Sequence, residues 1–262
     1  MHSVRPKKNL GQHFLKDPAI AAVIVDAMLL PNDCRQVLEV GPGMGILTDF
    51  LFQKKDLLVN VVDIDKESVT FLHNKYLEKI NNIIEGDFLN IEFEKIFKGS
   101  FVIIGNFPYN ISTQILFRVL DSRERIPEVV GMFQKEVAER IAGTPGGKEY
   151  GILSVFMQAW YDVELIMQLN QEDFSPPPKV KSSVLHFVRK ENFTLQADEA
   201  SFRRVVKTAF NQRRKTLRNA LSALMSKELS SKIPFAHLRA EALSWSQFVE
   251  LTNAVDKLLE TK

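Results

Sequence analysis

Short apolar runs alternate with amphipathic stretches along roughly the first two thirds of the chain. The apolar runs predict strands at 36–40, 58–62, 83–84, 101–104 and 129–133. The stretches between them carry apolar residues at helical spacing, which predicts helices. Strands that alternate with helices are typical of a doubly wound parallel sheet. The pattern therefore predicts an α/β fold.

The pattern changes in the last part of the chain. Two further apolar runs, 163–168 and 182–188, flank the segment Phe-Ser-Pro-Pro-Pro-Lys at 174–179, which predicts a hairpin that closes the sheet with an antiparallel strand. From residue 191 onward the residues read as helices. We therefore expect two domains, an α/β domain over 1–190 and a small all-α domain over 191–262.

Composition excludes several classes of protein. Hydrophobic residues make up 45% and charged residues 25% of the chain, as in soluble globular proteins. The single cysteine, Cys34, excludes a disulfide framework, and the five histidines lack the spacing of metal ligands, so we expect no metal. No apolar run reaches transmembrane length. The basic N-terminus precedes an apolar run, but Asp17 and Asp26 interrupt that run and Asp17-Pro18 is a helix start, so we expect a cytoplasmic protein and no signal peptide.

Charge is distributed unevenly between the two expected domains. Residues 191–262 hold 12 Lys/Arg against 8 Asp/Glu, whereas residues 1–190 hold 22 against 24. Between Arg203 and Arg218 there are seven basic residues and no acidic one. Such a segment can be a solvated helix face, but seven cations without a counter-charge favour contacts with phosphates. The RNA-binding candidates are Arg203, Lys207, Arg213, Arg214, Lys215 and Arg218.

A glycine-rich loop follows the first strand. Glu-Val-Gly-Pro-Gly-Met-Gly at 39–45 lies between strand and helix, and Asp63 lies 22 residues after Gly41 at the end of the next strand. Gly41 and Gly43 let the backbone approach a nucleotide-like ligand, and the carboxylate can accept both ribose hydroxyls. Position 46 is Ile, which breaks the dinucleotide fingerprint G-x-G-x-x-G. The loop fits S-adenosylmethionine better, although on its own it leaves a nicotinamide oxidoreductase possible.

The most informative segment for chemistry is Asn-Phe-Pro-Tyr at 106–109, directly after the predicted strand 101–104. Adenine N6 is a poor nucleophile because its lone pair is delocalised. The Asn106 side-chain carbonyl and the Phe107 backbone carbonyl, held outward by Pro108, can accept both N6 hydrogens, and Tyr109 can stack on a flipped base. An ordinary turn is the alternative, since Asn and Pro are common turn residues.

Six motifs occur together and in order: Lys-Asn-Leu-Gly-Gln-His-Phe-Leu (8–15), Gly-Pro-Gly-Met-Gly (41–45), Gly-Asp (86–87), Gly-Asn-Phe-Pro-Tyr (105–109), Phe-Ser-Pro-Pro-Pro-Lys-Val (174–180) and Phe-Asn-Gln-Arg-Arg-Lys-Thr-Leu-Arg (210–218). With them the chain resembles the ribosomal RNA adenine N6,N6-dimethyltransferase family over residues 8–255, and most closely its bacterial small-subunit, kasugamycin-sensitivity branch. His13 stands where the family usually has Asn, Asp63 where Glu is frequent, and Lys181 where an acidic residue is common.

The resemblance implies a Rossmann-like class I methyltransferase sheet that uses S-adenosylmethionine. It implies two adjacent adenosines near the 3′ end of 16S rRNA in the small ribosomal subunit as substrate, with the protein a monomer active in ribosome biogenesis. The implied cofactor contacts are His13, Leu15, Gly41, Gly43, Asp63, Asp87 and Asn106. The implied catalytic residues are Asn106, Phe107, Pro108, Tyr109 and, as a second wall for the base, Phe174. The alternatives are a large-subunit (23S) methyltransferase of the macrolide-resistance type and a non-catalytic RNA-binding factor.

Overall fold

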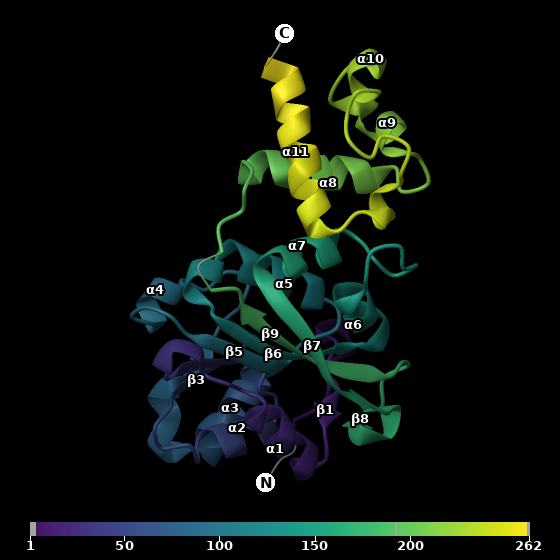
Figure 1. Ribbon diagram of the computed structural model, residues 1–262. Helices are drawn as coiled ribbons and strands as arrows, with labels where there is room; N and C mark the ends of the chain where they lie inside the picture. Colours follow the sequence, from purple (N-terminus) through teal and green to yellow (C-terminus); the bar gives the residue numbers. More distant parts are fainter. Residues whose placement is uncertain (1–3, 192, 261–262) are drawn as a thin grey trace. The chain divides into compact units, whose positions relative to one another are not determined.

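The computed structural model describes residues 4–191 and 193–260 (Figure 1). Its strands are β1 (Phe14–Leu15), β2 (Gln36–Val40), β3 (Leu58–Asp63), β4 (Ile83–Glu85), β5 (Val102–Asn106), β6 (Glu128–Gln134), β7 (Tyr161–Leu169), β8 (Phe174–Ser175) and β9 (Ser182–Arg189). Its α-helices are α1 (Pro18–Asp26), α2 (Ile46–Leu51), α3 (Lys66–Lys75), α4 (Phe93–Ile96), α5 (Ser112–Asp121), α6 (Lys135–Ala142), α7 (Ile152–Trp160), α8 (Glu199–Asn211), α9 (Leu217–Ala220), α10 (Lys227–Ser230) and α11 (Trp245–Glu260).

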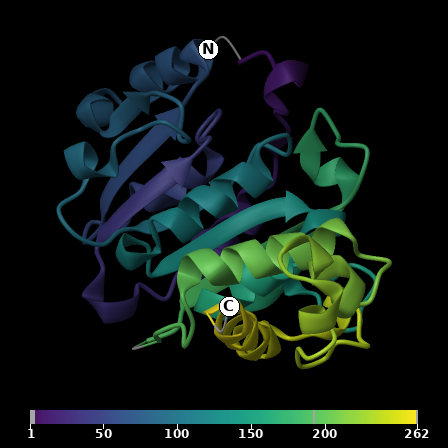
Figure 2. The same ribbon diagram turned by 90° about the horizontal axis from the view of Figure 1, so that it is seen from above.

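A seven-stranded sheet forms the centre of the α/β part, and its twist is visible from above in Figure 2. The strand order is β4-β3-β2-β5-β6-β9-β7. The pairs β2–β3, β2–β5, β3–β4 and β5–β6 are parallel, and β9 pairs antiparallel with β6. The predicted α/β sheet with an antiparallel closure is therefore confirmed. The chain turns from β2 toward β3 on one side and toward β5 on the other, so a switch point, where ligands bind in such folds, lies beyond the carboxyl ends of β2 and β5.

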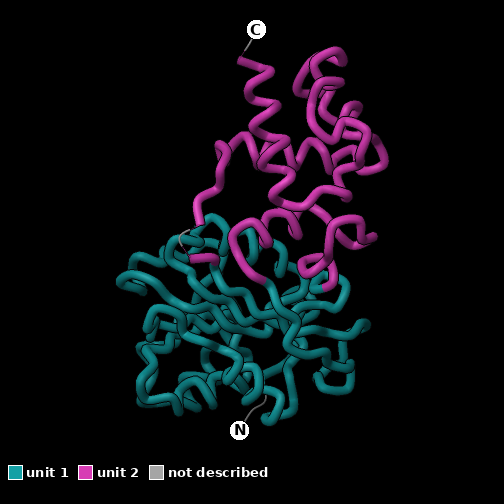
Figure 3. The backbone as a smooth tube through the Cα atoms, in the orientation of Figure 1, with its two compact units in different colours: residues 1–138, 163–189 teal, residues 139–162, 190–262 magenta. Residues whose placement is uncertain are grey.

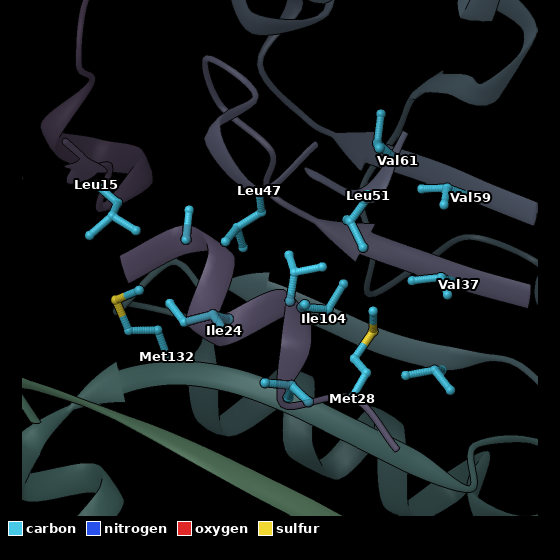
Figure 4. Packing of buried hydrophobic residues seen from close by; sticks show 14 of the residues in the cluster. Leu15, Ile24, Met28, Val37, Leu47, Leu51, Val59, Val61, Ile104 and Met132 are labelled. Atoms are coloured by element: carbon cyan, nitrogen blue, oxygen red, sulfur yellow. The ribbon is translucent and has the colours of Figure 1, made fainter. Parts of the chain in front are cut away.

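Buried apolar side chains hold α1 and α2 against the sheet (Figure 4). Val59 and Val61 lie two residues apart on β3 and so point to the same face, where Leu47 and Leu51 of α2 join the same cluster. All four are at most 4% exposed. Burying each such side chain contributes about 1.5–3 kcal/mol. This packing holds α2, and with it the preceding glycine loop, against the sheet.

Two helix starts were predicted, and one of them differs. The Asp17 side chain accepts a hydrogen bond from Ala19 N at 2.8 Å with Pro18 at the first helical position, as expected for α1. Ser112 was expected to cap α5, but Ile111 is the capping residue. The Ser112 hydroxyl instead donates to the Tyr109 carbonyl oxygen at 3.3 Å, which stabilises the turn that precedes the helix.

The chain forms two compact units, shown in different colours in Figure 3: residues 1–138 with 163–189, and residues 139–162 with 190–262. This division differs from the expected contiguous domains 1–190 and 191–262, because 139–162 belongs with the helical part. The reason is packing between distant residues: Phe202 of α8 lies with its ring centroid 6.0 Å from that of Phe156 and 5.9 Å from that of Trp160, both in α7. No helix within the described residues is long and apolar enough to cross a membrane.

Candidate active site

A pocket of about 160 Å³ lies in the α/β unit at the carboxyl edge of the sheet. It is lined from five places in the chain: residues 10–14, Val40 with Gly41 and Gly43, residues 62–64, residues 86–89 and residues 106–111. The ends of β2, β3 and β5, together with the loop after β4, therefore meet at one cavity. This is the edge where an open α/β sheet binds its ligands.

The glycine loop after β2 has a shape that needs glycine. Gly41 and Gly43 have φ angles of 68° and 57°, in the left-handed region that other residues rarely adopt. A Cβ atom on Gly43 would lie 2.6 Å from a ring carbon of Phe14, another residue of the pocket lining. Glycine at position 43 therefore lets the loop pack directly against Phe14.

Asp63, the last residue of β3, places a buried carboxylate in the pocket wall. The residue is 7% exposed, and its two oxygens accept hydrogen bonds from Gly43 N at 3.2 Å and Asp65 N at 2.9 Å. Burial raises the pKa of Asp63 from 3.8 to about 6, although these backbone bonds oppose the rise. Each oxygen keeps a further lone pair, so the carboxylate can accept hydroxyl hydrogens of a ligand.

A second buried acid lies in the strand that precedes the glycine loop. Glu39 of β2 is 1% exposed, and its carboxylate accepts a hydrogen bond from the Thr48 hydroxyl at 2.6 Å. Burial raises the pKa of Glu39 to about 8. Glu39 does not line the pocket, and its bond to Thr48 joins β2 to α2, the two elements that flank the loop.

Asp87, a predicted cofactor contact, lines the pocket in the loop after β4. Its carboxylate accepts hydrogen bonds from Leu89 N at 2.9 Å and from Asn90 Nδ2 at 2.6 Å. The adjacent Gly86 donates its N–H to the Asp63 carbonyl oxygen at 2.9 Å. The acidic ends of β3 and β4 are thus held side by side.

Asn106 ends β5 and reaches into the pocket. Its Nδ2 donates to the His13 carbonyl oxygen at 2.7 Å. Among the described residues no donor to Oδ1 is found, so this oxygen can accept from a ligand. The Phe107 ring is fully buried and packs edge-on against Phe133 at 5.2 Å between ring centroids, so only the Phe107 backbone serves the pocket.

Tyr109 forms an aromatic wall together with a residue of the N-terminal segment. The rings of His13 and Tyr109 stack with centroids 5.4 Å apart and an interplanar angle of 27°. His13 Nδ1 lies 2.8 Å from the Pro176 carbonyl oxygen, which orients the imidazole. The Tyr109 hydroxyl bonds to the hydroxyl of Ser182, and burial raises the pKa of Tyr109. Ser182 was not singled out from the sequence.

Two predicted site residues do not line the pocket. Leu15 and Phe174 lie opposite each other in the β1–β8 ladder and are 4% and 1% exposed. Both belong to the apolar core cluster. In this structure Phe174 therefore does not form a second wall for a base, and Leu15 does not contact the cavity.

The pocket combines the glycine loop, the Asp63 carboxylate and the Asn-Phe-Pro-Tyr segment. Residues 3–257, nearly the whole chain, match the model of the family described as ribosomal RNA adenine dimethylase. The chain belongs to this family.

The relatives agree with this assignment. The ribosomal RNA small subunit methyltransferase A of Cytophaga hutchinsonii is 51% identical over 253 residues, which cover 97% of this chain and 98% of that protein. A dimethyladenosine transferase from Plasmodium falciparum has a similar structure, with a TM-score of 0.77, 26% identity, and coverage of 94% of this chain and 98% of that one. The 23S rRNA methyltransferase ErmE shares the fold, with a TM-score of 0.68, 24% identity, and coverage of 93% and 99%. This adenine dimethylase is therefore a methyltransferase by family and by fold.

In this dimethylase the six predicted cationic residues differ in their surroundings. Arg203 pairs with Glu199 at 3.0 Å and lies over the Phe156 and Trp160 rings. Arg213 pairs with Glu241 at 2.7 Å and also donates to a backbone carbonyl. These two arginines stabilise the helical unit. The other four, Lys207, Arg214, Lys215 and Arg218, are exposed.

The structure adds two residues beside this exposed group. Thr216 forms an antiparallel bridge with Arg239, and Arg218 N donates to the Ala236 carbonyl oxygen at 3.0 Å. These backbone contacts bring the exposed residues His237 and Arg239 next to the segment 214–218. The two segments lie about twenty residues apart in the sequence and share no motif, so their contact could not be predicted from the sequence. Within residues 4–191 and 193–260 there is no group of three His, Cys, Asp or Glu side chains that could hold a metal ion.

Proposed function

We propose that this dimethylase transfers methyl groups from S-adenosylmethionine to N6 of two adjacent adenosines near the 3′ end of 16S rRNA, which yields N6,N6-dimethyladenosine during small-subunit biogenesis. The observation that carries the proposal is the orientation of Asn106, whose Nδ2 is held by the His13 carbonyl so that Oδ1 can accept from a ligand. The choice of subunit is supported by relatives about half identical to this chain that are named for the small subunit.

The pocket suits the nucleoside part of S-adenosylmethionine. The loop after β2 lines the pocket with Gly41 and Gly43, where a ligand can approach the backbone, and the Asp63 carboxylate can accept ribose hydroxyls. Asp87 marks the neighbouring strand end, near which we place the adenine amine, and His13 belongs to the same lining. When bound, the cofactor supplies an activated methyl group.

The residues at the end of β5 prepare the acceptor. Asn106 Oδ1 and the Phe107 carbonyl oxygen accept the two N6 hydrogens, which favours a pyramidal nitrogen with an available lone pair. Tyr109 supports the flipped base by stacking, and its ring is held between His13 and the hydroxyl of Ser182. The methylated ammonium is acidic enough to lose its proton to water, so catalysis rests on positioning and on these acceptors.

RNA affinity comes from the helical unit. The exposed side chains of Lys207, Arg214, Lys215 and Arg218 are suited to RNA phosphates, and Arg239 extends the same surface. Phosphate contacts supply affinity without choosing a sequence. A shaped, assembled RNA is therefore a better substrate than a free strand. We further propose that the protein acts as a cytoplasmic monomer without a metal.

Methylation of purified, unmethylated small subunits tests the substrate and the product together. We expect mass spectrometry of the digested RNA to show N6,N6-dimethyladenosine from small subunits and none from large-subunit RNA. Dimethyladenosine only in large-subunit RNA would move the assignment to the macrolide-resistance type, and monomethyladenosine as the sole end product would refute dimethylation.

The variant Asn106→Ala tests the chemistry. We expect it to abolish most transfer while the protein stays folded, because one N6 acceptor is lost. Asn81→Ala, a change at an exposed asparagine outside the pocket lining, is the matched control. Near-normal turnover of folded Asn106→Ala would remove Asn106 from this role.

A further inference from the structure

One wall of the pocket comes from the N-terminus and lies far from the sheet in sequence. We call residues 5–13 the N-terminal strap. Residues 10–13 of the strap line the pocket. At one end of the strap, Asn106 Nδ2 donates to the His13 carbonyl oxygen, and Asn110 Nδ2 donates to the Asn9 carbonyl oxygen at 3.3 Å. These two bonds hold the strap only on the side of β5. A second anchor is needed on the side of β3, where Asp63 is proposed to bind the ribose.

Asp65 supplies that anchor. The residue is 2% exposed and is the capping residue of α3, accepting from Glu67 N at 3.1 Å. Its carboxylate also bonds to two side chains of the strap, the Lys7 ammonium and Gln12 Nε2, the latter at 3.1 Å. Lys7 N in turn donates to Gln12 Oε1 at 2.9 Å, so the three residues form a closed ring. A capping residue needs only the helix bonds, and the bonds to the strap are additional.

The charge of Asp65 suits this task. Burial alone would raise its pKa, but the hydrogen bonds from Lys7 and Gln12 hold the pKa of Asp65 below its usual value. The carboxylate is therefore ionised at neutral pH, and charge-assisted hydrogen bonds are stronger than neutral ones. Asp65 N also donates to the Asp63 carboxylate at 2.9 Å, so the anchor and the ligand-facing carboxylate belong to one turn.

We propose that Asp65 is a positioning residue that holds the N-terminal strap as a wall of the cofactor pocket and so sets cofactor affinity without touching the cofactor. The proposal rests on the proposed function only for the identity of the ligand. Asp65 is not among the lining residues, whereas Gln12, which it holds, is. Loss of the anchor should therefore loosen the wall around Gln12, whereas the end of the strap at His13 keeps its own bond to Asn106.

Asp65→Asn tests this role with little change in shape. Asn is as good a helix cap as Asp, and its oxygen can still accept from Glu67 N at the position that also faces Lys7. The change removes the charge that pairs with Lys7 and turns an NH₂ donor toward the donor Gln12 Nε2. We expect the dissociation constants of S-adenosylmethionine and S-adenosylhomocysteine, measured by calorimetry, to rise about tenfold, since charged hydrogen bonds are lost. At saturating cofactor the turnover number should stay near wild type.

A ligand-free measurement separates the strap from the rest of the fold. In hydrogen exchange followed by mass spectrometry, peptides covering the strap should exchange faster in Asp65→Asn than in wild type. Asp17→Asn is the matched control, because Asp17 also caps a helix with its carboxylate but makes no bond to the strap. Lys7→Met, a change at a partly exposed side chain, should raise the same dissociation constants, and adding it to Asp65→Asn should have little further effect.

The outcomes distinguish this proposal from the proposed function. Unchanged strap exchange in Asp65→Asn would overturn it, and so would additive effects of the two variants. Wild-type protein that binds neither cofactor form would overturn the proposed ligand, while the exchange experiment would still decide the role of Asp65.

Discussion

Neutralising Asp63 should make the ligand-free protein more stable at neutral pH while weakening its cofactor binding. Burial raises the pKa of Asp63 to about 6 in the folded protein, from 3.8. About two pKa units correspond to a destabilisation of roughly 3 kcal/mol, which arises from keeping this carboxylate ionised in the folded state at pH 7. The pocket therefore lowers the stability of the fold, as expected for a preorganised ligand acceptor.

The sign of the pH dependence follows from the raised pKa. Between about pH 4 and pH 6 the folded protein holds the Asp63 proton and the unfolded chain does not. The stabilising contribution is thus fully present below about pH 4 and is lost as the pH rises through about 6. Between pH 5 and pH 7.5 the loss amounts to about 1.4 kcal/mol.

Asp63→Asn removes this titration. The amide oxygen can keep one of the two backbone bonds, from Gly43 N or Asp65 N, and the other is lost at a cost of about 1 kcal/mol. The net expectation is a ligand-free variant about 2 kcal/mol more stable than wild type at pH 7.5, with the advantage about 1.4 kcal/mol smaller at pH 5.

Urea unfolding of both ligand-free proteins at the two pH values measures this difference, and all other titrating groups cancel because both proteins contain them. Calorimetry at pH 7.5 should show at least tenfold weaker binding of S-adenosylmethionine to the variant, because an amide offers one acceptor oxygen in place of two. A stability difference that is the same at pH 5 and pH 7.5 would refute the reasoning about the raised pKa, and unchanged cofactor affinity would refute the ribose assignment.

Two further predictions concern the strand contact behind the site and the cationic segment. A Cβ on Gly105 would overlap the Val40 carbonyl oxygen, so Gly105→Ala should destabilise the protein by about 1–3 kcal/mol in thermal unfolding. An unchanged melting temperature would show that β2 and β5 can separate at little cost. Arg213→Ala should lower the stability of the protein, since Arg213 pairs with Glu241. Replacing Arg214 and Lys215 with Ala should instead weaken binding to the ribosomal subunit and flatten the dependence of log K on log salt. The slope should fall by about one unit for each phosphate that the variant no longer neutralises. Equal salt slopes for wild type and the double variant would contradict RNA binding at this segment.

Much of the architecture could be predicted from the sequence because its determinants are local. The apolar run 36–40 coincides with β2, and the cap of α1 by Asp17 depends only on neighbouring residues. The positions of Asp63 and Asn106 at strand ends follow from the same periodicity. Since the carboxyl ends of parallel strands meet at one edge, the sequence also indicated that these side chains share a site, and the pocket contains both.

Other features were decided only by contacts between residues distant in sequence. Trp160 and Phe202 pack together, so residues 139–162 join the helical unit although they follow a strand-helix pattern. Phe174 precedes three prolines and was expected to form a wall of the base pocket. Its pairing with Leu15 across the β1–β8 ladder instead places it in the core. A sequence motif does not specify which face of a short strand a neighbouring element will cover.

The same holds for charged and polar side chains. Arg213 and Arg214 are adjacent in a basic motif, yet Glu241 engages the first and leaves the second exposed, a difference set by the fold of residues 236–241. Asp65 resembles an ordinary helix cap in the sequence, and only the return of the N-terminal strap brings Lys7 and Gln12 to its carboxylate. Local patterns determine which elements form and where their ends lie. The partners of a side chain depend on which elements the tertiary structure brings together, because hydrogen bonds and ion pairs act only over a few ångströms.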